Sequence, residues 1–527
     1  MVSVITMSPC NEEGFRVNKN VTRQMARRKR RIEQRLDKND NRGCQRPMIT
    51  ASNIHYEIAE RAEGIGAGGI GLIHMMARKL GLPEAIDGDL HLLKIHLPYH
   101  ESDHVLNIAY NLMAGGTRLE HLEYRRNDVV YLDALGSRRI PDPTTAGDFC
   151  RRFDRASIEQ LMETFNRIRV KVWRQQDEAF FEEAVLDADG TMAETTGQCK
   201  YGMDINYKGQ WGYHPLIISL ANTGEPMYLV NRSGNRPSHE QAAGYFDRAI
   251  AVCREAGFRK VLLRGDTDFT QTEHLDRWDA DGVGFVFGID AMDNLYEHAE
   301  NLPEIAWLPL PRRPRYEVRT CPRRRPDNVK EKIVRQRQFE NIELTGEHVA
   351  QFPYSPTNCK QTYRIVAVWK SLKVTRGEQR LFDDAKCFFY ITNDWTSPAA
   401  EIVAKANGRC NQENLIEQLK NGVGAIGAPL DNLLSNWAYM VMASLAWSLK
   451  AWAALLLPET GRWQERHREQ KQTLLRMDFA SFRQAMIEIP AQIVRTGRKI
   501  VYRLLAWNLW QPVFFRLLDQ LRKPLRC

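Results

Sequence analysis

The sequence predicts an α/β protein, in which a helical N-terminal region precedes a mixed sheet flanked by helices. Apolar residues recur at helical spacing between residues 46 and 175. From about residue 182, short β-favouring runs are bounded by Gly, Asn and Pro. The content of 43% hydrophobic and 26% charged residues is that of an ordinary globular protein. This composition excludes a fibrous or wholly disordered chain.

Residues 1–45 are polar and basic and lack apolar periodicity, so we expect a mobile arm. Its densest run is Arg27, Arg28, Lys29, Arg30 and Arg31. Two readings stay open for this run: a disordered arm, or a helix end lying along phosphates.

Charge is unevenly spread along the chain. Residues 16–38 carry +8 and residues 312–337 carry another +8, which leaves −7 on the rest of a chain of net charge +9. The second run contains Arg323, Arg324 and Arg325 and is interleaved with prolines, so we expect an extended loop. Two basic segments on a mildly acidic body indicate a polyanion partner, and the absence of an amphipathic aromatic stripe favours nucleic acid over a membrane. The alternative is solvated charge that keeps a large protein soluble.

Residues 46–175 are predicted to form a helical, DNA-binding N-terminal domain. Ile70, Leu72, Ile73, Met76 and Leu80 repeat at helical spacing. The turn at 141–145 should open a helix that runs through 149–153 and carries Arg151, Arg152 and Arg155. This helix fits the second helix of a helix-turn-helix and a capped surface helix equally well.

The following region, 176–289, should contain the first part of a catalytic sheet domain. Strands are expected at 184–186, 215–220, 227–230, 261–263 and 283–289, with a helix at 242–256 between the third and fourth. Residues 290–385 should form a separate β-rich insertion that holds the basic loop, with its clearest strand at 363–369. Residues 386–527 should return to the sheet with a strand at 387–391 and end in helices.

The expected cellular compartment follows from the cysteine pattern, the N-terminal sequence and the most apolar stretch of the chain. The ten cysteines include no CxxC pair, which argues against a disulfide framework and a zinc ribbon. Glu12 and Glu13 interrupt the N-terminus before any signal-like apolar run. The most apolar stretch, 437–457, contains Lys450 and is better explained by a buried helix pair than by a membrane span. We expect a cytoplasmic protein with no membrane contact.

Acidic residues end two of the expected strands. Asp187 and Asp189 lie on one face of the strand that begins near Ala184, because alternate side chains share a face. Asp266 directly follows the apolar run 261–263. Acids that end buried strands are costly unless they bind a cation or a partner, although either one alone also fits a turn cap.

The third acid lies on an expected helix. Ser397 is its expected N-cap, and the helix should run to about Asn421, with a possible break at Gly408. At 100° per residue, Arg409, Glu413 and Lys420 share one narrow face. A salt-bridged solvent face is the alternative interpretation.

These residues resemble a known family. The spacing Arg409-x3-Glu413-x6-Lys420 is similar to the Tyr-x2-Arg-x3-Glu-x6-Lys signature of bacterial insertion-sequence DDE transposases. With Asp189-Gly190-Thr191 and the run 264–269, it resembles the IS-four superfamily. The runs 141–149, 212–216 and 419–422 look most like its IS-thirteen-eighty branch. Two features depart from the pattern: Ala406 occupies the signature tyrosine position, and the N-terminal extension is long.

The resemblance implies an RNase H-like catalytic domain in which Asp189, Asp266 and Glu413 hold two Mg²⁺ ions, with Mn²⁺ as a substitute. It implies a cut-and-paste transposase that binds terminal inverted repeats, cleaves the ends and joins them to target DNA as a homodimer on paired ends. Arg409 and Lys420 would contact phosphates, and the two basic runs would hold flanking or target DNA. Asp187 is the alternative first ligand. The rival functions are an inactivated, DNA-binding repressor and a nuclease on the same fold.

Overall fold

The computed structural model describes residues 19–36, 54–56, 63–96, 98–197, 199–311, 333, 337, 340–376, 379–497 and 499–525. The helices are α1 (Lys19–Leu36), α2 (Ile70–Leu80), α3 (Leu82–Asp89), α4 (Glu101–Met113), α5 (Leu122–Arg126), α6 (Val129–Leu135), α7 (Pro143–Cys150), α8 (Arg155–Trp173), α9 (Ala242–Ala256), α10 (Leu275–Ala280), α11 (Asp293–Glu300), α13 (Ala399–Asn407), α14 (Cys410–Glu417), α15 (Leu433–Leu455), α16 (Gln464–Arg476), α17 (Phe479–Phe482) and α18 (Gln511–Leu521).

The strands are β1 (Gly64–Ile65), β2 (Glu183–Gly190), β3 (Ala193–Glu194), β4 (Asp204–Ile205), β5 (Trp211–Tyr213), β6 (Leu216–Leu220), β7 (Glu225–Val230), β8 (Lys260–Gly265), β9 (Gly284–Ile289), β10 (Leu308–Pro309), β11 (Glu340–Tyr354), β12 (Tyr363–Arg376), β13 (Gln379–Thr392), β14 (Ala491–Thr496) and β15 (Lys499–Leu504). The strands and the helix expected between residues 182 and 289 are confirmed, and α9 has the expected bounds.

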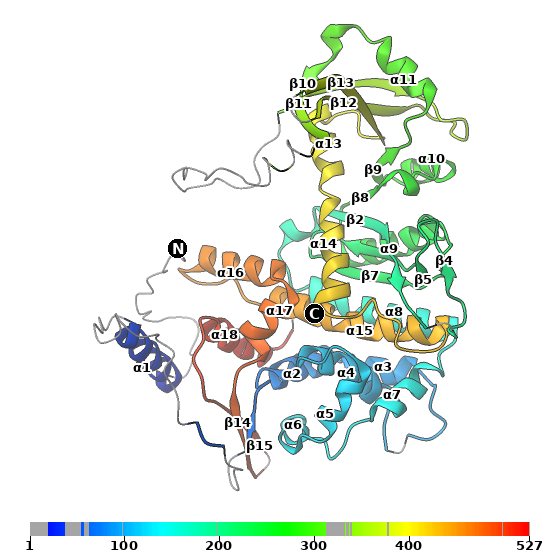
Figure 1. Ribbon diagram of the computed structural model, residues 1–527. Helices are drawn as coiled ribbons and strands as arrows, with labels where there is room; N and C mark the ends of the chain where they lie inside the picture. Colours follow the sequence, from blue (N-terminus) through cyan, green and yellow to red (C-terminus); the bar gives the residue numbers. More distant parts are fainter. Residues whose placement is uncertain are drawn as a thin grey trace.

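A mixed sheet organises the molecule. Among the described residues its strand order is β10-β11-β12-β13-β9-β8-β2-β6-β7. β2 pairs antiparallel with β6 and parallel with β8, and β8 pairs parallel with β9. The carboxyl ends of β2 and β8 therefore lie at the same edge of the sheet. The expected mixed α/β architecture is confirmed (Figure 1).

The β-rich insertion continues this sheet. β13 pairs antiparallel with β9 through Phe389 to Thr392, and the long strands β11 and β12 extend the sheet beyond it. The division expected between residues 385 and 386 falls inside β13, because that strand spans both the predicted insertion and the predicted second part of the catalytic domain. In Figure 1 these strands form the upper lobe, and α13 and α14 run down from it past β2.

The long apolar helix α15 lies at the centre of the protein. It packs against α4, α7 and α8 on one side and β7 on another. Within the described residues it is the one helix long and apolar enough to cross a membrane, and its most apolar window is completely buried in the protein. The stretch expected to be a helix pair is one continuous helix, because Lys450 is accommodated inside it rather than interrupting it.

The N-terminal helices share their core with the C-terminal segments. β1 pairs with β14 of the C-terminal hairpin β14–β15, and α18 packs on α2. The apolar faces expected on α2 and α4 are buried. Between residues 63 and 175 the described residues form β1 and the helices α2 to α8, and one continuous hydrophobic core joins them to the sheet and to α15.

The helix expected to run through residues 149–153 is shorter than predicted. α7 ends at Cys150, and a new helix, α8, begins at Arg155 behind its own Asp154 cap. Of the eight residues of α7, only Thr144 and Asp148 are exposed. The Asp142 side chain caps α7 by accepting from the Thr145 N–H, as the capped-helix interpretation expects, and the recognition-helix interpretation stays a prediction.

The basic arm contains a helix. The run Arg27–Arg31 lies on α1, where Arg27, Arg30 and Arg31 are exposed. Arg28 Nη1 donates to the Leu504 carbonyl at 3.1 Å, and Lys29 pairs with Glu33 at 3.4 Å. Arg323, Arg324 and Arg325 lie outside the described residues.

Candidate active site

Two neighbouring parallel strands bring the first two predicted acids together. Asp189 is the penultimate residue of β2, and Asp266 directly follows β8. The register pairs Asp187 with Arg264, so Asp189 and Asp266 each lie two residues beyond that pair. Because both strands are rich in buried apolar residues, their positions in the sheet are fixed by the core behind them.

Arg409 lies between these carboxylates. Its Nη1 is 3.4 Å from Asp189 Oδ2 and 3.9 Å from Asp266 Oδ2. Asp189 Oδ1 also accepts a hydrogen bond from the Gly190 backbone N–H at 2.8 Å. One guanidinium therefore offsets two negative charges that the fold places side by side.

The two aspartates are held in an environment that disfavours their charge. Burial raises the pKa of Asp189 to about 7; Arg409 opposes this shift, and the nearby charges of Asp266 and Glu413 add to it. Burial also raises the pKa of Asp266, against the effect of Arg409. Mutually repelling, partly buried carboxylates are typical of a site that gains stability from a bound cation.

Glu413 comes from the helix that crosses β2. Its charge contributes to raising the pKa of Asp189, and its side chain is exposed. The preceding residue, Gln412, is buried, accepts a hydrogen bond from the Ser219 hydroxyl and donates to the Ile217 carbonyl at 3.2 Å. This anchor to β6 fixes α14 and so fixes where Glu413 projects.

The helix carrying Glu413 is not continuous, unlike the simplest prediction. α13 ends at Asn407, α14 begins at Cys410, and residues 418–422 form a wider π-helical turn that contains Lys420. A Cβ at Gly408 would overlap the Arg264 guanidinium, so the break anticipated at this glycine has a packing cause. The N-cap position is Pro398 rather than Ser397, whose N–H instead donates to Asp394 at 2.9 Å.

Lys420 lies at the margin of the site. Burial lowers its pKa, while the charges of Glu194 and Glu417 act in the opposite direction. The charge of Lys420 in turn lowers the pKa of His214, although burial and Arg232 have larger effects on that pKa. Lys420 is therefore close to β3 and β5, on the side of the site where the chain leaves β2.

Asp187, the alternative first ligand, has a different environment. Its carboxylate accepts from Arg264 Nε and Nη2, each at 2.7 Å, and it is fully buried. Arg264 Nη1 also donates to the Lys405 carbonyl at 2.9 Å and so ties β8 to α13. A bidentate buried pair occupies both oxygens of Asp187.

Sequence reasoning missed the roles of Arg264 and His214. From the sequence, Arg264 was assigned no role of its own within the run 264–269. The signal that reveals its role is the register of β2 against β8, which places Arg264 beside Asp187. His214 packs against Gly190, where a Cβ would crowd its ring, and its Nδ1 is 2.9 Å from the Arg236 carbonyl. Residues 214 and 236 thus brace the backbone next to Asp189.

The donor set suits a hard divalent cation. Asp189, Asp266 and Glu413 offer carboxylate oxygens, the ligand type that Mg²⁺ prefers. Among the described residues, no group of three His, Cys, Asp or Glu side chains is already gathered closely enough to hold a metal. The donors fit in chemistry, and Arg409 supplies the countercharge in the present arrangement.

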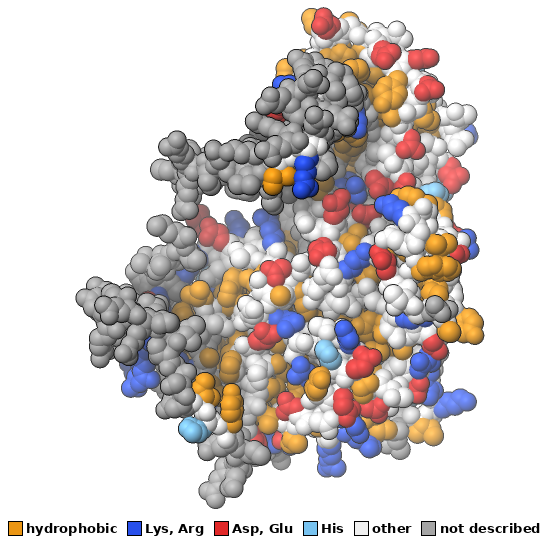
Figure 2. Space-filling view, viewed as in Figure 1, with side chains coloured by type: hydrophobic (Ala, Val, Ile, Leu, Met, Phe, Trp, Pro, Cys, Tyr) orange, Lys and Arg blue, Asp and Glu red, His pale blue; other side chains and the backbone are white. Residues whose placement is uncertain are grey.

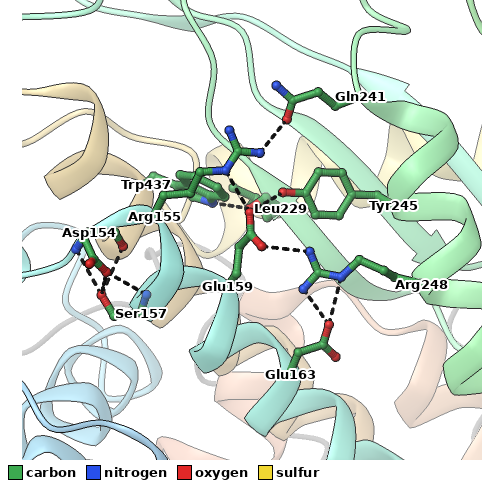
Figure 3. Close-up of polar contacts among 10 residues, drawn as sticks. All are labelled: Asp154, Arg155, Ser157, Glu159, Glu163, Leu229, Gln241, Tyr245, Arg248 and Trp437. Carbon is green, nitrogen blue, oxygen red and sulfur yellow. Dashed lines mark hydrogen bonds and ion pairs between the residues drawn. The ribbon is translucent and has the colours of Figure 1, made fainter.

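A second polar cluster lies between α8 and α9 (Figure 3). Arg248 pairs with Glu159 at 3.2 Å and with Glu163 at 2.6 Å, while Arg155 pairs with Glu159 at 2.9 Å. Gln241 accepts from Arg155 at 3.0 Å. Each arginine here already has a carboxylate partner, so the cluster joins two helices rather than offering a free anion site.

The described surface carries both signs of charge. In the face shown in Figure 2, acidic and basic side chains are interspersed over the sheet and the helices beside it.

The fold and the site together define a mixed α/β protein with an acidic centre bordered by arginine and lysine. The family model described as transposase DDE domain group 1 matches residues 65–525, and the chain belongs to this family. No curated protein matches the chain. A similar solved structure is the cryo-EM structure of a piggyBac transposase synaptic complex with hairpin DNA, with a TM-score of 0.34, 10% identity and coverage of 81% of this chain and 83% of that chain.

Proposed function

We propose that this protein is a cut-and-paste DNA transposase that binds the terminal inverted repeats of its insertion sequence, cleaves at the ends and joins the 3′-OH ends to target DNA. The observation that carries the proposal is that Asp189 and Asp266, at the ends of the neighbouring strands β2 and β8, both contact Arg409, while the charge of Glu413 on α14 acts on Asp189. Membership of a DDE transposase family supports it independently.

We also assign the catalytic domain to the RNase H-like fold. The order β7-β6-β2-β8-β9, with three antiparallel strands followed by two parallel ones, supports this assignment. The spread of the quoted motifs along the chain supports a place in the IS-four superfamily, in its bacterial IS-thirteen-eighty branch.

The cofactor in this proposal is Mg²⁺, two ions, with Mn²⁺ able to substitute. Asp189, Asp266 and Glu413 would hold it. When bound, a pair of such ions activates the attacking oxygen and stabilises the leaving one. The raised pKa values of Asp189 and Asp266 support this role, because they arise first from burial and then from neighbouring carboxylates, and a bound cation would compensate negative charge in such a place.

The chain's own residues would orient the reacting DNA. Arg409 would exchange its aspartate partners for a phosphate, which its planar fork fits, and Lys420 would contact a neighbouring phosphate as a point charge. Water attacks the phosphodiester first and frees a 3′-OH at the element end. That hydroxyl then attacks the opposite strand or the target. The exposed arginines of α1 and the run 312–337 would hold flanking or target DNA.

Two ends must be cut in concert, so the proposed assembly is a homodimer on paired ends. Its place is the cytoplasm, on nucleoid DNA, without a membrane partner. The burial of α15 supports the last point.

Cleavage of linear DNA carrying the ends of the flanking element tests this function. With Mg²⁺ the wild type should cut at the end boundary, and EDTA should prevent cutting. Glu413→Gln should abolish cleavage while end binding persists. Glu401→Gln, on the exposed surface of α13, is the matched control and should cut normally.

The two rival functions give different results in the same assay. Binding without cutting by the wild type would indicate a transposase-derived repressor. Cutting that ignores the element ends would indicate a nuclease. Retained cutting by Glu413→Gln would remove this residue from the centre.

The salt dependence of binding tests α1. Each phosphate contact adds about 0.9 to the slope of log affinity against log salt. Replacing its exposed arginines by glutamine should reduce that slope, and the set to change is Arg23, Arg27, Arg30, Arg31 and Arg35. An unchanged slope would show that α1 does not contact DNA.

A further inference from the structure

A small hairpin beside the acidic centre exposes aromatic side chains. The aromatic hairpin, residues 201–213, contains β4 and β5, and β5 pairs with β3 on its other edge. Tyr207 at its tip is 92% exposed, Tyr201 is 78% exposed and Trp211 is 51% exposed. Large aromatic surface left in water is costly, so such a group suggests a partner that covers it.

The hairpin is rigidly built. At its tip the Asn206 side-chain oxygen accepts from the Lys208 and Gln210 N–H groups at 2.9 and 3.0 Å, and Gly209 adopts a positive φ of 81°. This turn leaves Tyr207 no fold-stabilising contact to make and points it outward, with the Lys208 ammonium 5.3 Å from its ring. The backbone of the turn is therefore fixed, and the Tyr207 ring projects from it into solvent.

The base of the hairpin is fastened to the body on two sides. Tyr201 N–H donates to the Asp431 carbonyl at 2.8 Å, and the Tyr213 hydroxyl donates to the Tyr201 carbonyl at 2.9 Å. A Cβ at Gly234 would overlap the hairpin backbone, so the loop after β7 packs directly against it. Its position relative to the sheet is fixed.

The hairpin is continuous with the site. β3 begins three residues after Gly190, the end of the strand that carries Asp189. Glu194 of β3 accepts from the Gln210 side chain at 2.6 Å and also acts on Lys420. The base of the hairpin is thus connected to the end of the strand that carries Asp189, where the proposed function places the scissile phosphate, and the aromatic tip projects from this base.

We propose that the aromatic hairpin binds unpaired bases of the DNA end by stacking, with Tyr207 as the main platform. The inference rests on the proposed function, because that function brings a DNA end to this edge. Aromatic rings stack on any base face, and an adjacent cation reinforces the contact, so an exposed tyrosine with a lysine beside it fits single-stranded DNA. Duplex DNA hides its base faces and should not engage the tip.

The test compares a short duplex with a blunt end and the same duplex with a few unpaired 3′ bases, one of them 2-aminopurine. Binding is measured in EDTA by fluorescence anisotropy, and stacking by quenching of 2-aminopurine. The wild type should prefer the unpaired end and quench the probe. Tyr207→Ala should lose about tenfold of affinity for the unpaired end only, together with the quenching.

Two variants keep the result interpretable. Tyr207→Phe should behave as the wild type, because stacking does not use the hydroxyl. Tyr124→Ala removes a ring that is 69% exposed on α5 and should change nothing. Because Tyr207 is almost fully exposed, Tyr207→Ala should unfold at the wild-type temperature.

Three outcomes would overturn the inference. In the first, Tyr207→Ala binds both probes as the wild type does. In the second, it binds both more weakly by the same factor. In the third, it changes only the mass of the complex in light scattering, which would make the hairpin a contact between copies of the chain. If the wild type cuts element ends while Tyr207→Ala quenches normally, the hairpin inference alone fails. If the wild type quenches but never cuts, the proposed function alone fails.

Discussion

A carboxylate in the core, Glu225, and a carboxylate at the edge of the sheet, Asp189, have different partners. In the core, Glu225 accepts from Arg169 Nε at 3.0 Å and from the Trp173 and Trp452 indoles at 2.9 and 2.8 Å. At the sheet edge, Asp189 has one arginine contact at 3.4 Å and two further acids nearby. A fully paired carboxylate stabilises the fold, whereas a cluster with too few positive partners is kept for a ligand.

The largest expected effect comes from breaking the core network. Glu225→Gln leaves the buried Arg169 without its charged partner, which should lower the free energy of unfolding by about 3–5 kcal/mol. Urea denaturation measures it. Cleavage per folded molecule should stay unchanged, and a stable variant that cannot cut would contradict the structural role given to Glu225.

The two aspartates of β2, Asp187 and Asp189, show the same difference between a paired and a poorly paired carboxylate within one strand. Asp187→Asn leaves Arg264 buried and unpaired, so it should cost about 3 kcal/mol of stability. Asp189→Asn removes repulsion and should leave the protein equally stable or more so, while abolishing cleavage. Thermal unfolding beside the cleavage assay measures both. The reverse pattern would make Asp187 the first ligand.

Features of the fold and the site that depend on residues close together in the sequence could be predicted, whereas features that depend on contacts between distant segments could not. The strand ends at Asp189 and Asp266 were predictable because each follows a local apolar run. The partner of Asp187 was not, because it depends on the register of β2 against β8. The same limit applies to the insertion: the strands at 363–369 and 387–391 were expected, but the length of β13, which joins the insertion to β9 in one strand, was not.

The helix carrying Glu413 shows a second limit. A rotation of 100° per residue in a regular helix placed Arg409, Glu413 and Lys420 on one face, and Arg409 and Glu413 do lie at the site. The break at Gly408 and the π-helical turn at 418–422 result from packing against Arg264 and the body, which a single helix geometry cannot anticipate.

Lys450 offers a smaller effect inside α15. Burial lowers its pKa to about 7 from an ordinary value of 10.5. The unfolded chain therefore binds a proton more tightly, so stability should rise as pH increases from 7 towards 10.5, and the penalty should be complete below pH 7.

Lys450→Met should accordingly stabilise the protein by about 2 kcal/mol at pH 7 and by much less at pH 10. The gain is moderated because Lys450 Nζ donates to the Leu475 carbonyl at 2.7 Å and lies 3.9 Å from the centre of the Trp447 ring. Urea denaturation at both pH values measures it. An equal gain at the two pH values would contradict the buried-charge explanation.

The smallest effect concerns Arg409 as countercharge. Arg409→Gln removes the cation between Asp189 and Asp266, so Mn²⁺ should bind the DNA-free protein about tenfold more tightly, equivalent to ~1.4 kcal/mol. Electron paramagnetic resonance of free Mn²⁺ measures it, with Arg462→Gln as a surface control. Weaker Mn²⁺ binding by Arg409→Gln would show that Arg409 supports the cation site instead of competing with the cation.

In the proposed mechanism Asp189, Asp266 and Glu413 form one cation site. Cleavage of the protein by bound Fe²⁺ with ascorbate and peroxide tests this, because the bound ion cuts nearby backbone and mass spectrometry locates the cuts. We expect cuts near residues 189, 266 and 413 together, suppressed by excess Mg²⁺ and absent from Glu413→Gln. Cuts confined to other segments, or unchanged in Glu413→Gln, would contradict it.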